Sequence, residues 1–226
     1  MDKVYARLIA LLLLLGTFFP AQAWGLDVFI GPRLGTLGVG AEVGVGFTDF
    51  IKLRGVVQGL DWTLEDKKVS GINYDFDLDF FTAGLLLDIH PLGIMPVGGS
   101  FRVTAGALYN ANKLSLEARP TQSVSVGGTD YAASDVERLD ADVKFNNIAP
   151  YVGLGWGTSP SLLPFAFTAD LGVLYQGSPR VSLNSPKANT TSGLAESLER
   201  EQEEMKDDLS SWKWYPVAMV GFAIIF

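Results

Sequence analysis

Residues Trp212–Phe226 read WKWYPVAMVGFAIIF, and they give the clearest indication of the fold. Large apolar side chains fall on alternate residues, with smaller or more mixed side chains between them. Because successive side chains of a β-strand point to opposite faces, the pattern predicts a strand with one broad apolar face. A strand that turns such a face to lipid and closes a transmembrane barrel accounts for it. The positions on this face are Trp212, Trp214, Val220, Phe222, Ile224 and Phe226.

The start of the chain has the pattern of a secretory signal peptide. Lys3 and Arg7 supply positive charge, Leu8–Phe19 is an apolar run, and Ala21–Ala23 fits a cleavage site. We therefore expect residues 1–23 to be removed and residues 24–226 to form one domain. An uncleaved membrane helix is the alternative, but the apolar run is short for a membrane span.

Composition excludes several classes of protein. The formal net charge is -8, so a basic face for nucleic acid is not expected. The chain has no Cys, which excludes disulfides, cysteine-ligated metals and a lipid anchor on cysteine. After the signal, no apolar run is long enough for a membrane helix. Two classes remain: a soluble periplasmic β-protein and an outer-membrane barrel.

Alternation with a period of two recurs along the chain. It is clearest in Leu37–Phe47, where apolar residues alternate with glycine and one acid. The linkers alternate in length, as in a barrel with short periplasmic turns and long outer loops. We predict an all-β fold, an eight-stranded antiparallel transmembrane barrel in the outer membrane. The expected strands are Leu26–Arg33, Leu37–Phe47, Phe50–Trp62, Asn73–Ile89, Phe101–Leu116, Asp140–Gly157, Phe165–Gly177 and Trp212–Phe226.

The longer connections are expected to lie outside the cell. Leu64–Ile72 and Arg119–Leu139 are polar and predict loops. Ser178–Ser211 is the longest connection, and within it Ser192 is expected to cap a short acidic helix over Gly193–Leu209. The helix would cover the barrel as a solvated lid or act as an acidic collar that admits cations.

Charged side chains opposite the apolar faces would line the interior, because a charge facing lipid costs ~2–4 kcal/mol at the membrane midplane. We expect these side chains to form one network that sets selectivity. Side chains can fill the interior of an eight-stranded barrel. Two alternatives are therefore open: a closed, salt-bridged core, or a narrow charged path that side-chain rearrangement opens for small solutes. The lumen candidates are Arg33, Glu42, Arg54, Arg102 and Asp170, with Asp88 on the same side.

The strand Asn73–Ile89 carries a row of acids, Asp75, Asp77 and Asp79, towards its outer end. A carboxylate row at a pore mouth would attract cationic solutes. A Ca²⁺ site is less favoured because the row lacks the glycine turn and final Glu of an EF-hand, and a solvated strand end is a further alternative. Apolar residues change parity at Phe80-Phe81, which predicts a β-bulge there.

No catalytic or metal site is expected. The single histidine, His90, precedes Pro91 in a predicted periplasmic turn. No serine stands in a Gly-x-Ser-x-Gly elbow, and no metal triad can be assembled. We therefore predict neither enzyme activity nor a cofactor.

Several strings resemble the CarO-type outer-membrane proteins, a family of ornithine-uptake porins linked to carbapenem susceptibility. The resemblance implies an eight-stranded barrel, a closed or very narrow lumen, and uptake of small, basic amino acids. The glycine-rich first hairpin departs from the pattern. The matching strings are VSGINYDFDLD at Val69–Asp79, VGGTDY at Val126–Tyr131, NIAPYVGLG at Asn147–Gly155, YQGSPRV at Tyr175–Val181 and WYPV at Trp214–Val217.

The last residues also resemble the C-terminal recognition signal of barrel assembly, through Gly221, Phe222, Ile224 and Phe226. Met219 departs from it, since a polar residue is more usual there. The expected partners are the barrel-assembly machinery, outer-membrane lipid and lipopolysaccharide, and small cationic solutes. We predict a passive channel for small solutes, possible substrates being basic amino acids such as ornithine. The alternative is a closed structural or surface-interaction barrel.

Overall fold

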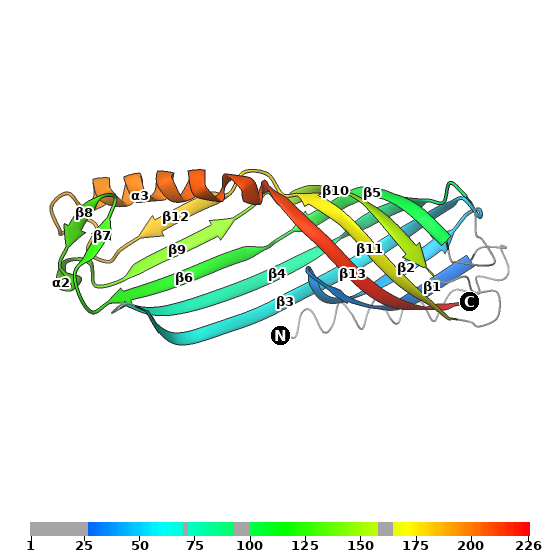
Figure 1. Ribbon diagram of the computed structural model, residues 1–226, viewed down its shortest axis with the longest axis horizontal. Helices are drawn as coiled ribbons and strands as arrows, with labels where there is room; N and C mark the ends of the chain where they lie inside the picture. The colour runs from blue at the N-terminus through cyan, green and yellow to red at the C-terminus, as the bar shows by residue number, and fades with distance from the viewer. Residues whose placement is uncertain (1–26, 70–71, 93–99, 158–164) are drawn as a thin grey trace.

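A computed structural model describes residues 27–69, 72–92, 100–157 and 165–226 (Figure 1). The predicted signal peptide, residues 1–23, lies outside the described residues. The strands are β1 Asp27–Gly35, β2 Gly38–Gly46, β3 Ile51–Val69, β4 Ile72–Ile89, β5 Ser100–Asn110, β6 Lys113–Pro120, β7 Val124–Val126, β8 Thr129–Tyr131, β9 Leu139–Lys144, β10 Ile148–Gly157, β11 Phe165–Tyr175, β12 Arg180–Asn184 and β13 Trp214–Ile225. The helices are α2 Ala133–Val136, α3 Leu194–Asp208 and the 3-10 helix η2 Leu209–Lys213.

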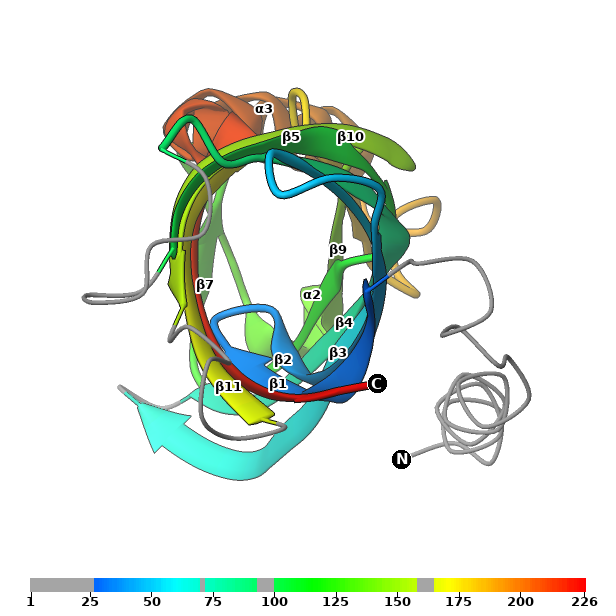
Figure 2. The same cartoon turned by 90° about the vertical axis from the view of Figure 1, so that its right-hand side faces the viewer.

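Eight strands close into a ring in the order β1-β2-β3-β4-β5-β10-β11-β13, and neighbouring strands are antiparallel. Figure 2 views this ring end-on. β13 pairs with β1 on one side and β11 on the other. The predicted barrel and the closing role of its last strand are therefore confirmed. Within the described residues, no helix combines the length and the apolar character that a membrane span requires.

The outside of the ring is a band of exposed apolar side chains. Leu85 is 60 % exposed and Val220 is 59 % exposed, although both belong to paired strands. Exposure of such an apolar surface to water is unfavourable, whereas the hydrocarbon core of a membrane solvates it. The band includes Leu34, Val39, Leu53, Leu85, Val103, Val152, Leu154, Phe167, Leu171, Val220 and Ile224.

Beyond the ring, the strands continue as an open sheet. The second half of β4, from Thr82, pairs with β5, whereas its first half, up to Asp79, pairs with β6. β9 and β12 follow β6, so the outer sheet runs β3-β4-β6-β9-β12. α3 lies along this outer half beside β12 (Figure 1).

The predicted outer loops were wrong in part. β3 and β4 pair up to Val69 and Ile72, so the expected loop Leu64–Ile72 is largely a hairpin. The connection Arg119–Leu139 holds β7, β8 and α2, and Ser178–Ser211 holds β12 before its helix. Outside lipid these strands need no continuous apolar outer face, so the membrane signature that marks the ring strands is missing there.

The acidic helix is confirmed as α3, but its predicted cap is wrong. Gly193 is the N-cap residue, with φ of 76°, and no side chain caps the helix. That backbone conformation favours glycine because a β-carbon would be strained there. The capping by Ser192 is therefore absent.

The predicted bulge at Phe80-Phe81 is also absent. Leu60 pairs with Phe80 and Gly59 with Phe81 in one uninterrupted register. The change in the pattern of apolar residues instead reflects a change of surroundings along a regular strand. In the ring the outward face of β4 meets lipid and carries leucines, and beyond the ring the same face meets water and carries aspartates.

Candidate functional site: the closed lumen

Arg54 lies at the centre of the barrel and is 2 % exposed. Its Nη1 donates hydrogen bonds to Oε2 of Glu42 and Oδ2 of Asp170, each at 3.0 Å. Its Nε lies 2.6 Å from Oδ2 of Asp88, and its Nη2 donates to the other oxygen of that carboxylate at 2.9 Å. One guanidinium from β3 thus joins acids on β2, β4 and β11.

Two more arginines complete this charged layer. Arg102, on β5, donates from Nη2 to Oδ1 of Asp170 at 2.6 Å. Arg33, on β1, donates to Glu42 at 3.4 Å and lies 3.6 Å from Asp170. The structure therefore brings together the five predicted lumen residues and adds Asp88 as a sixth member. Three arginines facing three carboxylates leave the layer with no net formal charge.

The remaining two strands of the ring contribute glycine at this level. A β-carbon on Gly155 of β10 would lie 2.5 Å from Nε of Arg102 and 2.6 Å from Oδ1 of Asp170. A β-carbon on Gly221 of β13 would lie 3.4 Å from Oε1 of Glu42. The glycines on the inner faces therefore leave the room that the charged side chains occupy.

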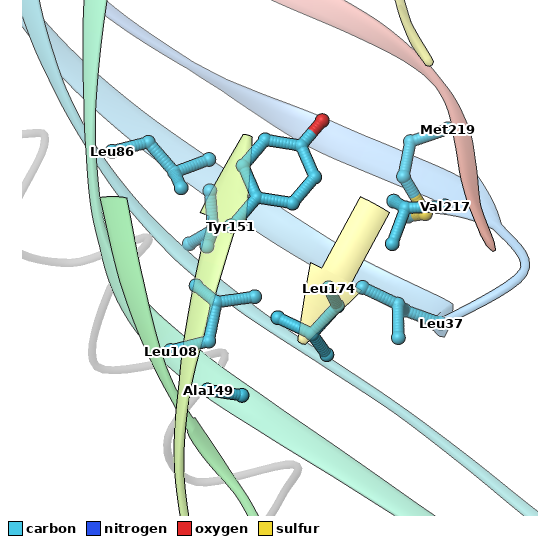
Figure 3. Close-up of a cluster of buried hydrophobic side chains, with 9 residues drawn as sticks. Leu37, Leu86, Leu108, Ala149, Tyr151, Leu174, Val217 and Met219 are labelled. Carbon is cyan, nitrogen blue, oxygen red and sulfur yellow. The ribbon is translucent and has the colours of Figure 1, made fainter. Parts of the chain in front are cut away.

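An apolar layer lies next to the charged one on its outer side. Along β3 and β4, the next inward-facing residues after Arg54 and Asp88 are Val56 and Leu86. Buried side chains from different strands of the ring form one cluster here (Figure 3). Each is at most 5 % exposed. The layer consists of Leu37, Val56, Leu86, Leu108, Ala149, Tyr151, Leu174, Val217 and Met219.

A polar layer follows further out. Gln58 donates from Nε2 to Oγ1 of Thr82 at 3.1 Å, and Gln176 donates from Nε2 to the Trp212 carbonyl at 2.9 Å. The three side chains are at most 2 % exposed. The lumen thus holds three successive layers of buried side chains.

The apolar layer was not predicted from the sequence, which indicated only charged side chains inside the lumen. A signal existed, because Leu86 and Leu108 share the inward parity of Asp88 and Arg102. Met219, which departs from the expected assembly signal, belongs to this layer and is 3 % exposed.

Two crystal structures from Acinetobacter baumannii, CarO and CarO2, are similar to this chain. Each is 26% identical to it, over 88% of this chain and 98% of theirs, with TM-scores of 0.62 and 0.63 respectively. No protein-family model and no curated protein matches the sequence. The chain is an outer-membrane β-barrel, and these two structures support a CarO-type protein. This agrees with the resemblance noted in the sequence, and it places the protein in the outer membrane of a Gram-negative cell.

The acidic row of this barrel lies away from the lumen. Asp75, Asp77 and Asp79 share the outward face of β4 with Leu85, and Asp75 accepts a hydrogen bond from Arg119 at 2.9 Å. The expected position at a pore mouth is therefore wrong. Because no bulge interrupts β4, the row continues the outward face of the membrane part of the strand.

The row borders a polar depression of about 370 Å³ on the outer sheet. Asp142, on β9, belongs to its lining. Partial burial alone would raise the pKa of this carboxyl, but hydrogen bonds from Lys113 and Ser115 hold the pKa below its usual value. Among the residues that the structure describes, no group of acids and histidines is arranged to hold a metal ion.

The residues of the predicted assembly signal occupy both faces of β13. Gly221 faces the charged layer, whereas Phe222 packs against Phe165 and Phe167 with ring centroids 5.4 Å apart in each pair. Ile224 and Phe226 are 44 % and 52 % exposed on the lipid side. The strand therefore presents the apolar face that the sequence pattern predicts.

His90 follows the last residue of β4 at the opposite end of the ring from α3, and it is 2 % exposed. Burial, followed by the positive charge of Lys52, lowers the pKa of His90 to about 4. The side chain is therefore neutral at neutral pH. It adds no charge to the periplasmic end of the lumen.

Proposed function

We propose that this CarO-type barrel is closed at rest and acts as a structural or surface-interaction barrel through its outer half. The observation that supports the proposal is the filling of the lumen by the charged, apolar and polar layers in series. A solute crossing the barrel would have to displace buried ion pairs and then a water-free apolar layer. Removing one partner from a buried ion network costs about 3–5 kcal/mol, so the charged layer resists opening.

Facilitated passage of small solutes, including ornithine, is the second candidate. It is favoured by incomplete hydrogen bonding inside the lumen. The Nε atoms of Arg33 and Arg102, and Oε1 of Gln58, are buried and form no hydrogen bond within the described residues. Groups without partners lower the free-energy cost of a rearrangement, because fewer bonds are lost when they move.

The two candidates differ in liposome swelling with ornithine or arginine as the solute. A closed barrel gives no swelling above that of empty liposomes. The triple variant Leu86→Ala, Leu108→Ala, Leu174→Ala thins only the apolar layer, so it also stays closed. Its matched control is Leu85→Ala, Leu87→Ala on the lipid face. Swelling by the wild type would overturn the proposal and favour the facilitator.

The role of the acidic row can be tested in the same liposome-swelling experiment. If the wild type admits ornithine and the variant Asp75→Asn, Asp77→Asn, Asp79→Asn admits less, the row steers cations over a distance although it lies outside the mouth. Equal rates for neutral and cationic solutes would argue against steering.

We also propose which partners the barrel contacts. Its apolar band, which includes Leu171, Val220 and Ile224, would contact outer-membrane lipid, and its outer half would stand among lipopolysaccharide sugars. The barrel-assembly machinery would bind β13. Cross-linking from a photoreactive residue placed at Val220 tests the lipid contact against the same residue placed at Val217, which is buried.

A further inference from the structure

An apolar cavity of about 270 Å³ lies in the outer half, on the concave side of the open sheet. It is separate from the three layers of the lumen and from the acidic depression on the opposite face of the sheet. Residues from five strands (β4, β6, β7, β9 and β12) and from α3 line it. Those that matter here are Tyr74, Leu116, Leu139, Leu183, Glu201 and Met205.

The cavity lies beside the part of α3 that is less buried than its beginning. Leu194 and Leu198, in the first turns, are buried against Val126 and Val136. One turn later the helix presents Glu201 and Met205 to the cavity, and both are only partly buried. The apolar lining is therefore left incompletely packed by the protein itself.

Several apolar side chains of the lining are also only partly buried. Tyr74, Leu116, Leu139 and Leu183 point to the concave side but remain partly exposed. Inward-facing leucines of an ordinary core would be fully buried, since each gains about 1.5–3 kcal/mol from leaving water. A ligand with an apolar body would supply the missing contacts.

Glu201 gives the cavity a charge. Its Oε2 accepts a hydrogen bond from the Gly127 amide at 2.8 Å, and no lysine or arginine within the described residues forms an ion pair with it. The rest of the helix adds to the negative potential, which favours a cation over an anion. The other acids of α3 are Glu196, Glu199, Glu203, Glu204, Asp207 and Asp208.

We propose that this cavity binds a small organic cation, with an apolar body against the leucines and an ammonium group at Glu201. A volume of 270 Å³ equals that of about nine waters in the liquid. It suits an arylalkylammonium ion of about ten non-hydrogen atoms, a little below the size range of drug-like sites. The site is independent of whether the lumen conducts, so its failure and that of the proposed function are distinguishable.

The absence of Cys from the natural chain makes thiol labelling a direct test. Leu183→Cys places a thiol in the cavity, and Ser182→Cys places one on the opposite, exposed face of the same strand. The probe is phenethylammonium, present during maleimide labelling of the folded barrel in lipid nanodiscs. We expect millimolar probe to slow labelling at position 183 at least fivefold and to leave position 182 unchanged.

The charge is tested with a neutral probe and one variant. 2-Phenylethanol should protect position 183 less than phenethylammonium does, and Glu201→Gln should remove the difference. Leu139→Cys serves as a second reporter, and heat-modifiable gel mobility shows that each variant is folded. Absence of protection at both cavity thiols, or equal protection by the two probes with Glu201 present, would overturn the proposal.

Discussion

At the scale of single residues, the charged layer depends on Arg54, whose guanidinium contacts carboxylates from three other strands. A buried cation is stable only when such partners surround it. Glycine faces make the arrangement possible, because Gly155 leaves the space next to Arg102 and Asp170. The closure of the lumen therefore depends on the smallest residues as well as on the charges.

Replacing Arg54 by Leu should destabilise the barrel by about 3–5 kcal/mol, because three buried carboxylates lose their shared partner. Urea unfolding from lipid vesicles, followed by tryptophan fluorescence, measures the change. Arg119→Leu is the control. Arg119 also pairs with two acids, but its side chain is 48% exposed, so its loss should cost far less than the loss of Arg54. Equal effects of the two variants would contradict the role given to Arg54.

His90 makes stability depend on pH. An unfolded histidine takes up a proton near pH 6.5, whereas the folded side chain does so only near its pKa of about 4. The unfolded state therefore binds more protons in this window, and the stability of the barrel falls as pH drops from 7 to 5. His90→Gln should make the urea midpoint less dependent on pH over this range. A variant with the pH dependence of the wild type would disprove this.

At the scale of elements, β4 shows how one strand serves two solvents. It keeps a single register with β3 from Ile89 to Phe76, yet its outward side chains change from leucine to aspartate. The outward residues are apolar within the ring, where this face meets lipid, and acidic beyond the ring, where it meets water. Its inward face carries Asp88 in the charged layer and Tyr74 beside the outer cavity.

This change of solvent predicts opposite responses to substitution on one face of β4. Leu85→Arg should cost ~2–4 kcal/mol if Leu85 lies near the midplane, because the charge enters lipid. Asp77→Leu should change stability by no more than about 0.5 kcal/mol, since its side chain is exposed to water. The folded fraction after refolding into vesicles, read by gel mobility, compares the two. A larger loss with Asp77→Leu than with Leu85→Arg would refute the assignment of the faces.

The sequence predicted those elements whose pattern the membrane imposes. The closing strand Trp212–Phe226 and the inward placement of Arg54 and Asp170 follow from lipid rejecting charge on one face. The hairpin beyond Leu64 was not predictable in this way. It lies outside the membrane, where no contact with lipid requires apolar and polar residues to alternate. The predicted bulge at Phe80-Phe81 was wrong for a related reason. Where one face of a strand passes from lipid to water, its apolar residues give way to polar ones, and in the sequence this looks the same as the change of parity that an extra residue causes.

The candidate site was predicted for its charges and not for its closure. Glu42 and Arg102 stood out because charge on a glycine-rich or apolar strand is rare. Leu108 and Leu174 did not, because an apolar residue inside a barrel resembles any other core residue. The outer cavity depends on how far α3 stands from the sheet, a distance that no local pattern contains.

At the scale of the whole molecule, the barrel is divided along its axis into layers of different chemistry. The outer sheet with α3 extends beyond the ring (Figures 1 and 2). The charged, apolar and polar layers lie inside the ring. Each layer alone would obstruct a solute, and together they separate the periplasmic end from the outer half. The function proposed for the barrel therefore depends on closure of its lumen at rest.

Single-channel recording in planar bilayers tests this closure most directly. We predict no conductance steps from the wild type, and clear steps from the variant Arg54→Ala, Arg102→Ala, Leu86→Ala, Leu108→Ala, which thins two layers and shows that inserted barrels are detectable. Gel mobility confirms that both proteins are folded before insertion. Conductance steps from the wild type equal in size to those of the variant would contradict the account.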